Sequence, residues 1–209
     1  LRAGQLKDHD KSDLITKVIP VIYDPNAKCP KWLKFLDRIM GGNQDLISFL
    51  QRAVGYALTG DIREQCFFIL HGDGANGKST FIKTIGTLLG DYAQAASFET
   101  FLSKKQGSVA NNDIARMQGK RFISAVEAEE SRRLAENVIK QVTGGDVVAA
   151  RFLYAEYFEF IPQFKIFLAT NHKPKINCND PAIWRRVKLV PFAVRIPEME
   201  QIQDLDEQL

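Results

Sequence analysis

A glycine-rich segment, GDGANGKS at residues 72–79, narrows the possible folds of this 209-residue chain more than any other feature. It matches the pattern G-x-x-x-x-G-K-[ST] at every fixed position. The apolar run FFIL at residues 67–70 precedes it and is typical of a buried strand, while apolar residues at helical spacing follow it as far as Gly90. A strand, a glycine-rich loop and a helix in this order predict a phosphate-binding loop in an α/β fold.

The residue types in this loop suit a nucleoside triphosphate such as ATP. Glycines allow the backbone to curl so that successive N–H groups point at phosphate oxygens, and the start of the next helix adds partial positive charge. Lys78 is expected to reach the β- and γ-phosphates, and the Ser79 hydroxyl to hold Mg²⁺. A turn that ends in Lys-Ser by chance is the alternative. The residues expected to contact the nucleotide are Gly72, Asp73, Gly74, Ala75, Asn76, Gly77, Lys78, Ser79 and Thr80.

Acidic residues follow a second predicted strand, FISAV at residues 122–126, which ends next to Glu127 and Glu129. Ligands of open α/β sheets lie at the carboxyl ends of the strands. One carboxylate there can hold Mg²⁺ and a second can polarise an attacking water. The sequence therefore indicates Glu127 as a metal ligand and catalytic residue, with Glu129 as a second candidate. A solvated, acidic helix start would show the same pattern.

Polar side chains also adjoin two further predicted strands. Asn171 ends the apolar strand at residues 164–171, where its amide can orient the attacking water. Arg185 and Arg186 precede a fourth strand at residues 187–192, and either can be a finger that neutralises γ-phosphate charge across a subunit boundary. Ordinary turn chemistry for the asparagine and surface charge for the arginines are the alternatives.

The remaining segments are expected to surround this core. Helical patterns from Pro30 to the glycines at 41–42, and from Asn43 to Gly60, predict a small helical subdomain at residues 1–62. The ATPase core is expected at residues 63–197, and residues 198–209 would begin a truncated C-terminal extension. Residues 91–119 read as irregular apart from a short helix near 113–117, and residues 131–142 as a helix. Residues 147–162 predict a hairpin with its turn near 155–156, either packed in the core or projecting towards single-stranded nucleic acid.

Composition sets further limits. A hydrophobic content of 45% supports a packed core, and no apolar run approaches membrane-spanning length. Three scattered cysteines favour reduced thiols and a cytoplasmic protein. His172 and Cys178 share a segment, but two ligands make a poor zinc site. A formal net charge of +3 is compatible with nucleic acid without requiring it.

Taken in order, these motifs resemble the superfamily 3 helicases of the AAA+ class. They are most similar to the helicase part of phage and plasmid primases of the satellite-phage type, which are relatives of the poxvirus primase-helicase. The similarity spans residues 11–197. The segments that carry it are FFILHGDGANGKSTF, RFISAVEAEE, IKQVTGGDVVAARFLYAEYFEF, FKIFLATNHKP and AIWRRVKLVPF.

The resemblance implies an AAA+-like sandwich with a mostly parallel sheet, assembled as a homo-hexamer that hydrolyses ATP and moves along single-stranded DNA. It implies that Lys78 and Ser79 bind phosphate and metal, that Glu127 holds the metal, and that Asn171 is the polar sensor. One arginine of the 185–186 pair would act on the neighbouring subunit. A primase part is expected on the same full-length chain, in the bacterial cytoplasm if a phage or plasmid encodes it.

The resemblance also implies residues that contact DNA. Lys140 and Arg151 fall in the family's additional motif between the second acid and the sensor. Tyr154 stands at the expected hairpin tip, where Glu156 replaces the lysine of viral initiator helicases. A DNA helicase motor is the leading hypothesis. A nucleotide-gated loader that grips DNA without unwinding it, and a small-molecule kinase built on the same loop, are the alternatives.

Overall fold

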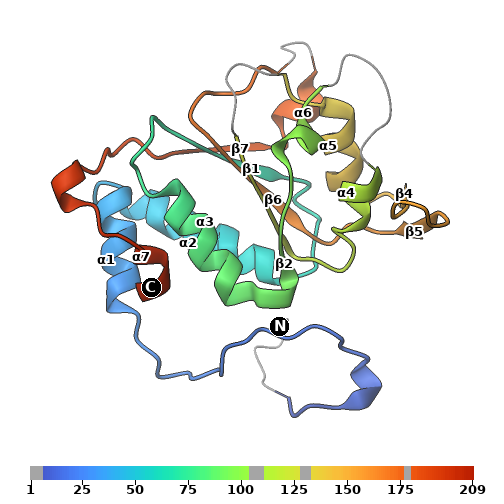
Figure 1. Ribbon diagram of the computed structural model, residues 1–209, viewed down its shortest axis with the longest axis horizontal. Coiled ribbons are helices and arrows are strands. Elements are labelled where there is room, and N and C mark those ends of the chain that lie inside the picture. Colours follow the sequence, from blue (N-terminus) through green and yellow to red (C-terminus); the bar gives the residue numbers. More distant parts are fainter. Residues whose placement is uncertain (1–6, 104–110, 128–132, 177–179) are drawn as a thin grey trace.

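The computed structural model describes residues 7–103, 111–127, 133–176 and 180–209. Its centre is a five-stranded sheet in the order β2-β3-β6-β1-β7, in which each neighbouring pair is parallel. The strands are β1 (Phe67–His71), β2 (Ala93–Ala95), β3 (Phe122–Val126), β6 (Lys165–Thr170) and β7 (Val187–Pro191). Helices cover both faces of the sheet (Figure 1). The predicted α/β sandwich with a mostly parallel central sheet is confirmed.

The helices begin and end near the predicted signals. Pro30 is the first residue of α1, and the Asn43 side chain accepts a hydrogen bond of 3.1 Å from the backbone N–H of Leu46 at the start of α2. The α-helices are α1 (Pro30–Ile39), α2 (Gln44–Leu58), α3 (Lys78–Leu89), α4 (Asn111–Ala115), α5 (Glu136–Thr143), α6 (Pro181–Trp184) and α7 (Leu205–Gln208). Short 3₁₀ turns are η1 (Lys11–Asp13), η2 (Gly90–Tyr92), η3 (Phe98–Phe101) and η4 (Glu198–Glu200).

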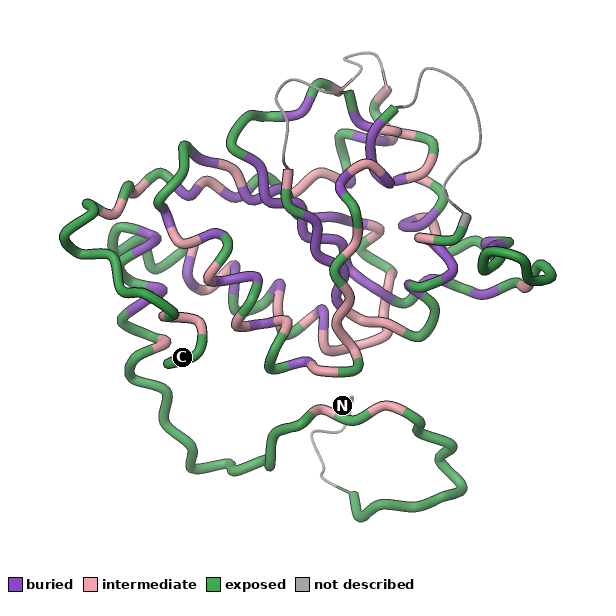
Figure 2. Tube along the Cα trace, viewed as in Figure 1, coloured by how far each residue is buried: buried purple, intermediate pink, exposed green. Residues whose placement is uncertain are grey.

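The strands alternate their side chains between two hydrophobic layers, because successive residues of a strand face opposite sides of a sheet. In β1, Phe68 and Leu70 join the layer that holds buried residues of α1, α2 and α3. Phe67 and Ile69 join the opposite layer, with buried residues of η3, α4 and α5. Figure 2 shows the buried trace concentrated in this central region. The two N-terminal helices thus share a core with the sheet.

The predicted hairpin is present. Strands β4 (Val148–Ala150) and β5 (Phe158–Phe160) pair antiparallel, with Val148 opposite Phe160. The hairpin projects from the side of the molecule opposite α1 and α7 (Figure 1). Its base packs in the core through Val148, while its tip is exposed. The hairpin therefore packs in the core at its base and projects into solvent at its tip, while a contact between the tip and single-stranded nucleic acid stays a prediction.

Two expectations are wrong in detail. Residues 91–119 were expected to lack a strand, yet Ala93–Ala95 forms the edge strand β2 beside β3. Alanine and glutamine have no strong preference for strands, so the sequence of β2 does not predict it. Its parallel pairing with β3 is what makes these residues a strand. The helix expected at residues 131–142 begins at Glu136, and Leu134 instead forms a bridge with Leu102. Residues 7–29 contain η1 but no α-helix or strand and are mostly exposed (Figure 2).

A lysine lies buried at the start of β6. Lys165 is 1% exposed, its Nζ donates to the backbone carbonyl of Thr59 at 2.7 Å, and it lies 4.2 Å from the ring centroid of Tyr56. Burial, followed by the nearby charge of Arg121, lowers the pKa of Lys165 from its ordinary 10.5 to about 8.

This lowered pKa predicts a pH-dependent stability. Between pH 8 and 10.5 the unfolded chain keeps a proton that folded Lys165 has lost, so its contribution to the free energy of unfolding rises with pH. The expected rise is about 2 kcal/mol relative to Lys165→Met, measured by urea denaturation at pH 8 and pH 10. Burial raises the pKa of Cys66 and Tyr56, which acts in the opposite direction but is common to both proteins. Parallel pH profiles for the two proteins would contradict the prediction.

Among the described residues, none of the helices combines the length and apolar character that a membrane span requires.

Candidate nucleotide-binding site

The glycine-rich loop (residues 72–77) connects β1 to α3 and is held by close backbone packing. A Cβ at Gly72 would lie 2.1 Å from the carbonyl oxygen of Phe192, and one at Gly77 would lie 2.6 Å from Cγ2 of Ile39 in α1. Gly77 also has a φ of 84°, which side chains rarely adopt. The Asn76 amide donates to the Phe192 carbonyl at 3.1 Å. The loop is therefore fixed between the end of β7 and α1.

Lys78 is the first residue of α3, and its side chain folds back over the loop. Its Nζ donates to the Gly72 carbonyl at 2.5 Å and to Oδ1 of Asn76 at 3.0 Å. It also donates to Oδ1 of Asn171, just beyond the end of β6, at 3.3 Å. The strand order explains this contact, because β6 is the immediate neighbour of β1. The structure therefore brings together two residues that lie 93 positions apart.

Glu127 follows β3 and lies on the other side of β6. Its backbone N–H donates to the Ala169 carbonyl at 2.9 Å, and the Thr170 hydroxyl contacts its Oε2. Its Oε1 is buried and has no hydrogen-bond partner among the residues that the structure describes. A buried carboxylate oxygen that accepts no hydrogen bond can still bind a cation, and carboxylate oxygens are ligands that Mg²⁺ prefers. Glu127 and the exposed Ser79 are thus suited to hold such an ion.

Burial and neighbouring charges shift the pKa values of two basic side chains at the loop. Burial lowers the pKa of Lys78, while the Asp73 carboxylate opposes that shift. Burial also lowers the pKa of His71 at the end of β1, and the charges of Lys173 and Lys78 lower it further. Desolvated positive charge next to a curled backbone favours a polyanion such as a nucleotide's phosphates.

The arginine pair occupies the opposite end of the sheet. The Arg186 carbonyl accepts from the backbone N–H of Phe67 at the start of β1. A five-residue strand rises roughly 16 Å, so neither guanidinium is near its own glycine-rich loop. Arg186 is 6% exposed, and its guanidinium donates to the Thr143 hydroxyl at 3.2 Å and the Ala182 carbonyl at 2.7 Å. Arg185 is exposed and reaches only Oε1 of Gln65 among the described residues, at 3.1 Å.

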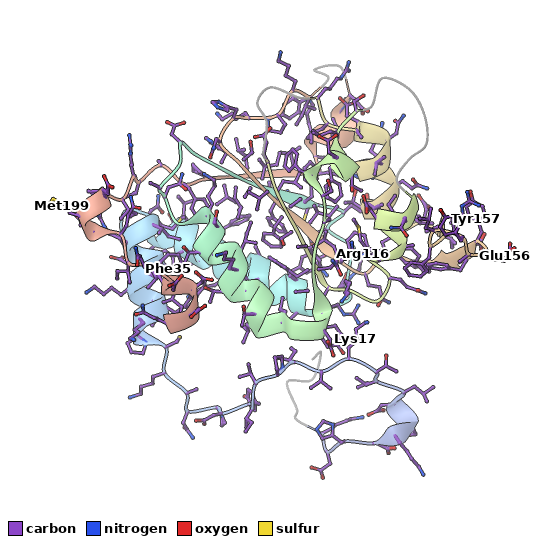
Figure 3. The ribbon with its side chains drawn as sticks, viewed as in Figure 1. Lys17, Phe35, Arg116, Glu156, Tyr157 and Met199 are labelled. Atoms are coloured by element: carbon purple, nitrogen blue, oxygen red, sulfur yellow. The ribbon has the colours of Figure 1, made fainter. Side chains whose placement is uncertain are left out.

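The predicted DNA contacts have different surroundings. Lys140 on α5 is ion-paired with Asp180 at 2.7 Å, and Asp180 caps α6 through the backbone N–H of Ala182. The Arg151 guanidinium lies 4.8 Å from the ring centroid of Tyr157 on the hairpin. Tyr154 is 98% exposed. Glu156 and Tyr157 stand at the projecting end of the hairpin (Figure 3).

Some contacts could not be predicted from the sequence. Thr170 beside Glu127 and Gln65 beside the arginines carry no motif of their own. Asn76 was predicted to contact nucleotide, but its buried contacts to Lys78 and Phe192 were not. Glu129, the second acidic candidate, and Cys178 lie outside the described residues.

Comparison with protein families gives two matches. Residues 70–186, which contain the glycine-rich loop, Glu127, Asn171 and both arginines, match a model described as a family of unknown function (DUF5906). Residues 1–41 match a model described as D5 N terminal like.

Individual relatives come from large DNA viruses. The chain is 33% identical over 159 residues, or 76% of its length, to L207/L206 of Acanthamoeba polyphaga mimivirus, named as a candidate helicase. It is 29% identical over 134 residues, or 62% of its length, to the protein named Primase D5 of Fowlpox virus. The aligned regions cover 16% and 17% of these proteins, so the chain spans about one sixth of their length.

A solved structure has a similar fold. The A form apo structure of the C-terminal region of NrS-1 superposes with a TM-score of 0.64 at 12% sequence identity. The match covers 92% of this chain and 43% of that one. At this identity the similarity concerns the fold alone.

Proposed function

Because the chain belongs to the DUF5906 family and to the wider primase-helicase family that includes D5-type proteins of large DNA viruses, we propose that it is the ATP-hydrolysing motor of a replication helicase. The observation that carries the proposal is the contact between Lys78 of the loop and Asn171 at the next strand end. With Glu127 at the third strand end, cation, amide and carboxylate converge on one edge of the sheet.

The side chains have separate tasks in the proposed reaction. Lys78 and the loop N–H groups hold the phosphates, and Ser79 and Glu127 would hold Mg²⁺, whose charge offsets that of the phosphate oxygens when it is bound. Asn171 lies where it can orient a water towards the γ-phosphate. The Thr170 hydroxyl contacts Oε2 of Glu127, while the buried Oε1 has no hydrogen-bond partner among the described residues and would be the oxygen that meets the metal.

The proposal extends to assembly. Arg185 is too far from its own loop to contact the γ-phosphate there, and its exposure suits a role in the loop of a second copy. In a homo-hexameric ring, the exposed Arg185 of one subunit could reach the loop of the next. The projecting hairpins of the subunits would then be directed at a single DNA strand. The exposed Tyr154 and the Arg151–Tyr157 pair would then stack on bases and contact phosphate.

The test is DNA-stimulated hydrolysis. The intact chain is expected to release phosphate from ATP faster when single-stranded DNA is present, and Glu127→Gln is expected to lower that rate by at least a hundredfold. Glu156→Gln, on the exposed hairpin tip, is the matched control and should retain the hydrolysis rate that the intact chain has without DNA. Equal rates for Glu127→Gln and the intact chain would refute the assigned role of this carboxylate.

One observation supports a second candidate function. Glu156 places negative charge at the hairpin tip, which disfavours a close approach of DNA phosphates. A nucleotide-gated loader that holds DNA without separating its strands is the alternative. Strand displacement from a forked duplex distinguishes the two, because only the motor releases the displaced strand in proportion to ATP hydrolysed.

A further inference from the structure

A cavity of about 590 Å³ lies beside the glycine-rich loop. Its walls come from α1, from the loop with the first turn of α3, and from the C-terminal segment (residues 196–209). Its volume falls in the range of small-molecule sites. The lining residues that carry the argument are Phe35, Ile39, Gly77, Thr80, Ile202 and Leu205. Figure 3 shows Phe35 on α1 next to α7.

The position of the cavity relative to the loop is informative. Lys78 Nζ and Asn171 mark the end of the loop where a γ-phosphate would lie. Gly77 and Thr80 line the cavity instead. A linear triphosphate held along the loop would therefore have its terminal phosphate near Asn171 and its nucleoside near the cavity.

The chemistry of the walls suits a nucleoside. Phe35, Ile39 and Leu205 provide apolar surface for the faces of a base. Gln201 and Gln208 also line the cavity, and although each Nε2 donates to a backbone carbonyl of the same segment, each amide keeps a second N–H and an oxygen for the edge of a base. Lys31, Lys34 and Arg38 also line the cavity, together with Glu200, which pairs with Arg38, so the lining carries more positive than negative charge. We propose that this cavity binds the base and ribose of the nucleotide whose phosphates the loop holds. The inference rests on the proposed nucleotide-binding function.

The C-terminal segment would then be a structural part of the nucleotide site. The Ile196 backbone N–H donates to the Ala75 carbonyl of the loop at 2.7 Å. Glu200 pairs with Arg38 of α1, and Asp206 pairs with Lys83 of α3 at 3.6 Å. Exposed ion pairs of this kind stabilise little by themselves. A bound base adds apolar contacts to the inner side of the segment, so nucleotide binding should hold it in place.

The experiment compares a nucleotide with its phosphates alone. The intact chain is titrated calorimetrically with the β,γ-imido analogue of ATP and with inorganic tripolyphosphate, both with Mg²⁺. The analogue is expected to bind roughly 10- to 100-fold more tightly, because only the analogue fills the apolar cavity. A chain shortened to end at Glu200 should lose most of this preference and keep its affinity for tripolyphosphate.

Two further variants keep the test decisive. The double variant Ile202→Ala, Leu205→Ala removes wall atoms without deleting the segment. If thermal unfolding shows that the shortened chain is not folded, this variant tests instead whether the cavity wall produces the preference for the analogue. Met199→Ala is the control, since Met199 is 98% exposed and does not line the cavity (Figure 3). The inference is overturned if the two ligands bind the intact chain equally, or if a folded wall variant keeps the full preference for the analogue. If neither ligand binds, nucleotide binding itself, and with it the proposed function, is wrong.

Discussion

Replacing Lys78 by alanine is expected to abolish ATP hydrolysis and to weaken ATP binding by at least a hundredfold. The Nζ of Lys78 is held between the Gly72 carbonyl and the side chains of Asn76 and Asn171, so it is already in place before a nucleotide arrives. A preorganised, desolvated cation interacts with developing phosphate charge far more strongly than one in water, and the loss of one such donor typically costs about 10²- to 10³-fold. Phosphate release and binding of a fluorescent ATP analogue measure the two effects.

A matched lysine separates this effect from a general loss of charge. Lys120 precedes β3 at the other end of the sheet, where its Nζ donates to the Asp91 carbonyl at 2.8 Å. Lys120→Ala removes the same charge from a less buried side chain, and is expected to hydrolyse ATP at the rate of the intact chain. If Lys78→Ala were folded and still hydrolysed ATP within tenfold of the intact chain, the site would have to lie elsewhere.

The loop was predictable because its chemistry is local. Glycine positions, Lys78 and Ser79 lie within eight residues, and the flanking strand and helix show their own periodicity. Glu127 and Asn171 were recognised for a related reason: each follows a strand, and parallel strands bring their carboxyl ends to one edge. The family resemblance implied the mostly parallel sheet that the structure confirms, whereas periodicity does not give the strand order that makes β6 the neighbour of β1.

Contacts between distant residues were not predictable. Thr170 meets Glu127 across 43 positions, and Gln65 meets Arg185 across 120. Thr170 and Gln65 were not recognised as functional residues in the sequence, so only the folded structure shows these two contacts. The same holds for residues 196–209, in which the short helix α7 contacts α3, and Leu205 and Leu209 pack against the hydrophobic layer on that face of the sheet. A four-residue helix has too little periodicity to be recognised in a sequence.

Burial distinguishes the two arginines, which the sequence presents as equivalent neighbours. Burial and the adjacent charge of Arg185 lower the pKa of Arg186, and its guanidinium is used within its own subunit by Thr143 and Ala182. Arg186→Ala would remove the donor to the half-buried Ala182 carbonyl and the donor to the Thr143 oxygen, which would keep only its own hydrogen bond to the Ile139 carbonyl. Arg186→Ala is therefore expected to destabilise the fold. Arg185 has an exposed side chain and is the better candidate to reach a second subunit.

Arg185→Ala is therefore expected to bind ATP normally but to hydrolyse it about 10³-fold more slowly, the usual scale for a finger supplied in trans. Because finger and loop would come from different subunits, the defect should be repaired by mixing. A Lys78→Ala subunit lacks a working loop but keeps Arg185, and an Arg185→Ala subunit has the reverse defect. Mixed rings place some intact loops opposite intact fingers, so the mixture should regain a substantial fraction of activity that neither variant shows alone. A mixture that stays inactive, while both variants assemble with the intact chain, would mean that Arg185 does not act on a neighbouring site.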